Sequence, residues 1–151
     1  MRTSPRQQIW EQFQLFEILV LLGARGPNLT LVTPLRIFRI VAADVWQRAA
    51  AAGTFAGTEH DLRDGFIHFS TAAQVAETAA RHYAGLANLL LVAVDVAALG
   101  DALRWEPSRG GALFPHLYAP LPTSAATLVV PLLLGADGVH VLPALDGEDQ
   151  R

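Results

Sequence analysis

The segment GFIHFSTAAQ, residues 65–74, is predicted to be a strand that passes directly into a helix. Phe66 and His68 fall on one face of this strand and Ile67 and Phe69 on the other, because side chains alternate along an extended chain. The closing residues TAAQ fit a capping box, in which a hydroxyl and an amide side chain each satisfy a backbone donor of the first helical turn. The cap explains the hydroxyl residues here without any catalytic role.

Further strands and helices are predicted on both sides of this segment. The expected strands are residues 35–41, 65–70, 88–96, 103–106 and 127–135, and the expected helices are residues 43–53 and 71–83. The run at 88–96 is apolar throughout, so we expect it at the centre of a sheet with both faces covered. Residues 113–122 contain three prolines and are expected to form an edge strand or a shaped loop, and Pro131 is expected to interrupt the last strand.

This order of elements favours an α+β fold in which small split sheets, antiparallel or mixed, have helices around them. The length suits one such domain, which we place at residues 35–135. Residues 1–34 are expected to be an N-terminal extension with an amphipathic helix at 7–22, either added in front of the domain or produced by a start codon assigned too far upstream. Residues 136–151 are expected to be a C-terminal tail.

The composition argues against several functional classes. There is no cysteine, which excludes disulfides, thiolate metal sites and a cysteine nucleophile. The net charge is −3, and all eleven basic residues are arginines that are scattered along the chain, so no basic stripe is present for duplex nucleic acid. Neither GxGxxG nor GxxxxGK occurs, which disfavours dinucleotide-binding and P-loop folds of the usual kinds.

One apolar run, residues 15–24, raises the question of a membrane segment. It is about half of the ~20 residues that a spanning helix needs, and it contains Glu17. Glu11 and neighbouring glutamines also interrupt the apolar core that a signal peptide requires. We therefore expect a cytoplasmic protein without a membrane partner.

Two histidines are candidates for chemistry. His68 is either a hydrogen-bonding or acid/base group, since imidazole titrates near neutral pH, or a satisfied histidine of the core. His116 lies between Pro115 and Pro120, and these prolines either stiffen a ligand-binding wall or only shape a turn. Both functions stay open on the sequence alone.

The other three histidines, at positions 60, 82 and 140, show no metal-binding spacing with one another. The stretch HDLRD at residues 60–64 is a weak cluster of possible ligands and is expected to be a polar loop. No metal site is therefore expected.

Arg39 alternates with Ile37 and Val41 on an otherwise apolar face of its strand. A buried guanidinium needs an anion or carbonyl oxygens as partners, and the anion is either an internal carboxylate or a phosphate or carboxylate ligand. The carboxylates considered as internal partners are Asp44, Asp95 and Glu106. Glu106 is also the carboxylate best placed for catalysis, although a residue in this position can be a solvated strand end.

Four segments together resemble a family of small bacterial proteins known as domain of unknown function 952. The matching segments are IFRIV…W at 37–46, DGFIHFST at 64–71, NLLLVAVDVAALGDALRWE at 88–106 and LFPHLYAPLP at 113–122. They occur in the family's order and spacing, and the resemblance covers residues 35–131. Two positions depart from the family pattern: Arg39 stands where a histidine is usual, and Phe69 where a cysteine is frequent.

The resemblance implies a fold similar to that of ADP-ribosyltransferases, with an NAD-binding cleft. It places Arg39, His68, His116 and Tyr118 on the cleft, with Trp105 or Tyr118 available to stack on a base. If the protein is an enzyme, it implies a transferase acting on NAD or a nucleotide phosphate, with Glu106 and His68 as catalytic residues. The alternative is a non-catalytic module that binds a small anionic metabolite or a protein partner through the same cleft.

Deletion of residues 1–34 is expected to leave a folded protein, because Trp10, Phe13 and Phe16 have no obvious partner in the family domain. Circular dichroism and a cooperative thermal transition of the shortened chain would check this. An insoluble or molten product would show that the segment belongs to the core.

Overall fold

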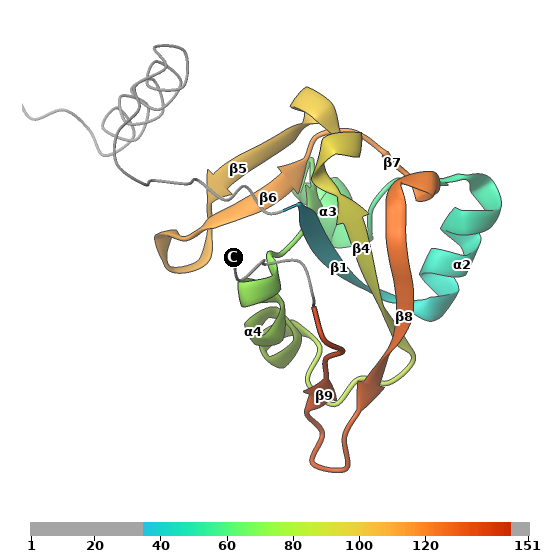
Figure 1. Ribbon diagram of the computed structural model, residues 1–151, viewed down its shortest axis with the longest axis vertical. Helices are drawn as coiled ribbons and strands as arrows, with labels where there is room; N and C mark the ends of the chain where they lie inside the picture. Colours follow the sequence, from blue (N-terminus) through green and yellow to red (C-terminus); the bar gives the residue numbers. More distant parts are fainter. Residues whose placement is uncertain (1–34, 146–151) are drawn as a thin grey trace, which may run out of the picture. The chain divides into compact units, whose positions relative to one another are not determined.

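A four-stranded antiparallel sheet is the main sheet of residues 35–145, the part of the chain that the computed structural model describes (Figure 1). Its strands are, in spatial order, β1 (Arg36–Ala42), β4 (Leu89–Asp95), β8 (Ala126–Leu134) and β9 (His140–Val141). β4 has a neighbour on each side, which confirms the central position expected from its apolar sequence.

Two smaller antiparallel sheets complete the strand structure. One has the order β3 (Ile67–His68), β6 (Leu113–Leu117), β5 (Leu103–Pro107), and the other pairs β2 (Thr54–Phe55) with β7 (Leu121–Pro122). The fold is therefore a mixed α+β fold with separate antiparallel sheets and few helices, which agrees with the fold class predicted from the sequence.

In the described part of the chain, three α-helices accompany the sheets: α2 (Ala43–Ala52), α3 (Glu59–Asp64) and α4 (Ala72–His82). Four short 3₁₀ turns occur at Val96–Ala98, Gly100–Ala102, Arg109–Gly111 and Thr123–Ala125. The capping box before α4 is confirmed, since the Thr71 backbone N–H donates to Gln74 Oε1 at 3.0 Å. α2 ends as predicted at Gly53, whose φ of 80° is in the left-handed region that favours glycine.

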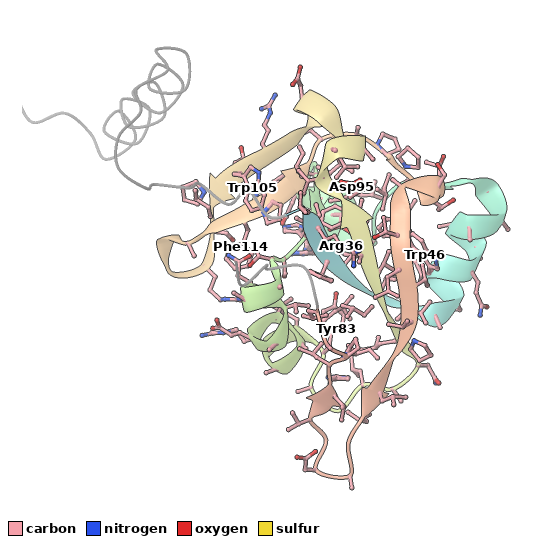
Figure 2. The ribbon with its side chains drawn as sticks, viewed as in Figure 1. Arg36, Trp46, Tyr83, Asp95, Trp105 and Phe114 are labelled. Carbon is pink, nitrogen blue, oxygen red and sulfur yellow. The ribbon has the colours of Figure 1, made fainter. Side chains whose placement is uncertain are left out.

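The hydrophobic core forms two clusters because residues of β1 alternate between its two faces. Ile37 and Val41 belong to a cluster that includes Trp46 of α2, and Phe38 and Ile40 belong to one that includes Val75 of α4. Figure 2 shows Trp46 at α2. Arg39 shares its face of β1 with Ile37 and Val41, so the chain places one charged group among apolar neighbours.

The prediction of an edge strand or shaped loop at residues 113–122 was wrong for residues 113–117, because β6 is the middle strand of its sheet, whereas β7 at residues 121–122 belongs to a two-stranded sheet and is an edge strand. Pro115 is tolerated in β6 for a local reason. Its carbonyl accepts from the Phe69 N–H at 3.0 Å, beyond the point where β3 ends at His68. In an antiparallel ladder a residue's N–H and C=O face the same neighbour, so the missing N–H lies where no ladder bond is required.

Pro131 does not interrupt the last strand, contrary to expectation, and β8 continues through it opposite Leu90. β9 pairs only with Leu133 and Leu134 of β8, so β8 has a single neighbouring strand at Pro131. The backbone N–H that proline lacks can therefore be spared at this position. Residues 60–64 were also predicted wrongly as a loop, because they lie within α3.

Several expectations concern residues that the structure does not describe. The helix at 7–22, the apolar run at 15–24 and the end of the tail at 146–151 lie outside residues 35–145. β9 falls within the stretch expected to be tail, and Leu142 and Leu145 pack against the second core cluster. Within residues 35–145, no helix has the length and apolar character needed to span a bilayer.

Replacement of Leu91 by alanine should lower the free energy of unfolding by about 2–5 kcal/mol, because the side chain is fully buried in β4 and its loss leaves a cavity. Urea denaturation would measure this. Leu133→Ala is the matched control, since that leucine on β8 is 63% exposed, and a loss comparable to that of Leu91→Ala would contradict the assignment of the core.

Candidate functional site

The carboxylate of Asp61 joins three elements of the fold. Oδ1 accepts from Arg39 Nη1 at 3.1 Å and from the His68 backbone N–H at 3.1 Å. Oδ2 accepts from Arg39 Nη2 at 2.7 Å, the Thr58 N–H at 2.7 Å and the Thr58 hydroxyl at 2.8 Å. Asp61 therefore connects β1, the start of α3 and β3.

Asp61, and none of the three carboxylates considered from the sequence, is the internal partner of Arg39. The side chains are 7% and 1% exposed, and Arg39 also donates to the His68 carbonyl at 2.8 Å. Burial by itself would raise the pKa of Asp61, but the hydrogen bond from His68 and the charge of Arg39 outweigh it and hold that pKa well below its usual range. The carboxylate is ionised at neutral pH.

His68 lies between two carboxylates. Its Nδ1 is 2.7 Å from Asp61 Oδ1, and its Nε2 is 3.2 Å from Asp64 Oδ2. The ring of His60 stacks on it, with centroids 4.8 Å apart. This position is polar and only partly buried, so His68 is not a histidine of the apolar core.

His116 forms a second histidine–carboxylate pair. Its Nδ1 is 2.8 Å from Glu106 Oε2, which also accepts from the Tyr118 hydroxyl at 2.8 Å. Burial lowers the pKa of His116 more than the bond to Glu106 raises it. Burial acts to raise the pKa of Glu106, but the bonds from His116 and Tyr118 prevail and lower it. A neutral His116 that donates from Nδ1 to an ionised Glu106 carries a lone pair on Nε2.

Strand pairing brings the two histidine–carboxylate pairs together. β3 and β6 place His68 directly opposite His116, and the ring centroids are 5.4 Å apart. Phe66 lies against both, with centroids 4.6 Å from His68 and 4.0 Å from His116. The juxtaposition follows from the register, since residues opposite each other in an antiparallel pair project to the same face.

A cavity of about 640 Å³ lies beside these pairs. Its charged and titratable wall includes two arginines and four of the chain's five histidines: Arg39, Arg109, His60, His68, His82 and His116. Asp64 lies in the same wall. Within residues 35–145, two buried side-chain polar atoms have no hydrogen-bond partner, Arg39 Nε and His116 Nε2, and both belong to residues of this wall.

The structure brings together three of the predicted site residues, Arg39, His68 and His116, on one cavity. Glu106 lies behind His116 and is not among the lining residues, and Tyr118 contacts Glu106 from an exposed position. Trp105 packs against the first core cluster, away from the cavity wall.

Sequence reasoning noted residues 60–64 as a weak cluster of possible ligands but set them aside as a polar loop, so it left Asp61, Asp64 and His60 out of the site. The structure places His60 beside Asp64 and His68. One signal was available for Asp61: Thr58 and Asp61 have capping-box spacing, and both bonds of the box are present.

Comparison with known proteins identifies relatives of the domain. The family model described as "Protein of unknown function (DUF952)" matches residues 40–129. The crystal structure of protein CC0527 from Caulobacter crescentus matches with 50% identity and a TM-score of 0.68, over 70% of this chain and 93% of that one. Its solution NMR structure matches with 50% identity and a TM-score of 0.64, over 70% and 90% of the two chains. No curated protein matches.

Replacement of Asp61 by asparagine should lower the free energy of unfolding by about 3–5 kcal/mol at pH 7, because it leaves the buried Arg39 without its counter-ion. Because folding depresses the pKa of Asp61, the contribution of this carboxylate is complete above the usual aspartate value of about 3.9 and is lost as pH falls below it. The difference between wild type and variant should therefore shrink in acid. Urea denaturation across pH would measure it.

Asp44→Asn provides the matched control for that experiment. Asp44 pairs with Arg48 at 2.9 Å, but the two side chains are 69% and 74% exposed, so its loss should cost about 1 kcal/mol or less. Equal effects of the two substitutions would show that the buried ion pair contributes no more to the free energy of unfolding than the exposed one.

Proposed function

The chain belongs to the DUF952 family of proteins of unknown function, and we propose that its cavity binds NAD or a related nucleotide. The observation that carries the proposal is the pair of unpartnered atoms in residues of the cavity wall. Buried polar groups are nearly always hydrogen-bonded, and those that are not call for an explanation such as a missing ligand. A ligand that reaches Arg39 Nε and His116 Nε2 would supply both partners.

The two atoms have opposite hydrogen-bonding character. Arg39 Nε carries a proton and can only donate, whereas Nε2 of a neutral His116 can only accept. The complementary ligand therefore presents an acceptor, such as a phosphate oxygen, and a donor, such as a sugar hydroxyl. Nucleotides carry both groups within one molecule, whereas inorganic anions offer chiefly acceptors.

The rest of the wall suits an anionic ligand with an aromatic part. Arg109 adds a second guanidinium, whose centre lies 5.0 Å from the ring centroid of Phe114. The volume of about 640 Å³ is within the range of ~300–1,000 Å³ typical of small-molecule sites. The family resemblance implies a fold similar to that of ADP-ribosyltransferases, which makes NAD the first nucleotide to test.

Any transfer chemistry would use a carboxylate other than Glu106. Glu106 Oε2 already accepts two hydrogen bonds, so this carboxylate orients His116 and is poorly placed to stabilise an oxocarbenium-like ligand. His116 Nε2 can act as a general base towards a ligand hydroxyl. Asp64 is the carboxylate in the cavity wall.

The alternative is a non-catalytic module that binds a small anionic metabolite. It is favoured by the state of Arg39, because both terminal nitrogens of its guanidinium already bond to Asp61. Such an arginine offers Nε alone and cannot grip a phosphate with two parallel bonds.

Calorimetric titration of the full chain with NAD, ADP-ribose, adenosine and pyrophosphate, in buffer containing a chelator, would test the proposal. NAD and ADP-ribose should bind, and adenosine and pyrophosphate should each bind at least ten-fold more weakly, because each lacks one of the two complementary groups. Equal binding of pyrophosphate and ADP-ribose would favour the anion-binding module. If the folded protein gave no heat with any nucleotide, nucleotide binding would be refuted.

Replacement of His116 by alanine should weaken NAD binding at least ten-fold, because it removes the acceptor in the cavity. His140→Ala is the control, since that half-buried histidine bonds to the Leu86 carbonyl and is not among the lining residues. Calorimetry and thermal melting of both variants would separate binding from stability. A large fall in melting temperature with unchanged affinity would mean that His116 is only structural.

A further inference from the structure

His60, Asp64 and His68 form a cluster in the cavity wall that is separate from the His116–Glu106 pair. Their candidate ligand atoms all lie within 4.8 Å of one another. Asp64 Oδ2 is 3.4 Å from His60 Nε2 and 3.2 Å from His68 Nε2. A tetrahedral ion with bonds of ~2.0–2.1 Å holds its ligand atoms about 3.3 Å apart, so these separations match those around a metal ion.

The hydrogen bonds of His68 require a positive charge at this place. Both oxygens of Asp61 accept from the Arg39 guanidinium and from backbone N–H groups, so Asp61 is the acceptor of the contact at 2.7 Å and His68 Nδ1–H is its donor. In a neutral imidazole, Nε2 then carries a lone pair directed at Asp64 Oδ2, which is also an acceptor. Two acceptors at 3.2 Å repel each other unless a proton or a metal ion lies between them.

The groups that orient His68 are already in place. Asp61 accepts from Nδ1, and Asp61 is held by Arg39 and Thr58. A carboxylate behind a histidine in this way fixes the ring and increases the basicity of its other nitrogen, and it is a recurring feature of metal-binding histidines. His68 would therefore be the rigid ligand of the cluster, while His60 and Asp64 are more exposed.

We infer that His60, Asp64 and His68 bind a divalent transition-metal ion through Nε2, a carboxylate oxygen and Nε2, respectively. Two imidazoles and one carboxylate suit Zn²⁺ and related ions, whereas Mg²⁺ prefers an all-oxygen shell. Three protein ligands leave at least one coordination position for water or a ligand group. All three residues line the cavity, so that position would be available to a molecule bound there.

One contact has to change when the metal binds. Arg63 Nη2 lies 2.6 Å from His60 Nδ1, which makes Nδ1 the acceptor, whereas coordination through Nε2 needs a proton on Nδ1. Arg63 is 69% exposed and can swing into solvent. The site does not depend on nucleotide binding, because all three ligands come from the chain itself.

Titration of the chelator-treated full chain with Zn²⁺ by calorimetry, in nucleotide-free buffer, would test the inference. One ion should bind per chain, and excess Mg²⁺ should not compete. Histidine imidazole signals in ¹H–¹⁵N spectra should shift for His60 and His68 and stay in place for His140. If the folded protein does not bind Zn²⁺, the inference of a metal site is overturned. This holds whatever the separate titration with NAD in chelator-containing buffer shows.

Variants would show that the ion occupies this cluster. His60→Gln and Asp64→Asn should each lower Zn²⁺ affinity at least ten-fold without changing the melting temperature, because both side chains are exposed. His140→Gln and Asp101→Asn are matched controls at a half-buried and an exposed residue outside the cluster, and both should bind Zn²⁺ like the wild type. Equal affinity of the cluster variants and the controls would also overturn the inference.

Discussion

The buried contact between Asp61 and Arg39 is the constraint on which the rest of the site depends. An arginine on the apolar face of β1 needs a counter-ion, and Asp61 of α3 supplies it. Asp61 meets this need and also caps α3 through Thr58 and holds the His68 backbone. A single carboxylate thus determines where a helix begins and where a short strand lies.

The position of His68 follows from this arrangement. Its backbone bonds to Asp61 and its carbonyl to Arg39, so the imidazole is held at the edge of the cavity with its Nε2 directed towards Asp64. Pairing of β3 with β6 then sets His116 opposite. The two histidines differ in electrostatic setting, because His68 lies between two carboxylates while His116 has one carboxylate and a partnerless Nε2.

Local patterns predicted much of the fold. The alternation in β1, the apolar run of β4, the glycine after α2 and the capping box before α4 all depend on neighbouring residues, so they can be read directly from the chain. The proline-containing strands β6 and β8 could not be judged in the same way. Whether a proline is tolerated depends on which neighbour the missing N–H would face, and that neighbour is distant in sequence.

The family resemblance made His68 and His116 candidates for a cleft. The sequence by itself determined that Arg39 needs an anion or carbonyl oxygens as partners, and that a helix begins after Thr71. These conclusions follow from residue type and from spacings of a few residues. Only the tertiary structure decided that the partner is Asp61, 22 residues away, and that Glu106 stands behind His116. The physical reason is that ion pairs and hydrogen bonds act over a few ångströms in space, whichever chain segments the fold brings within that distance.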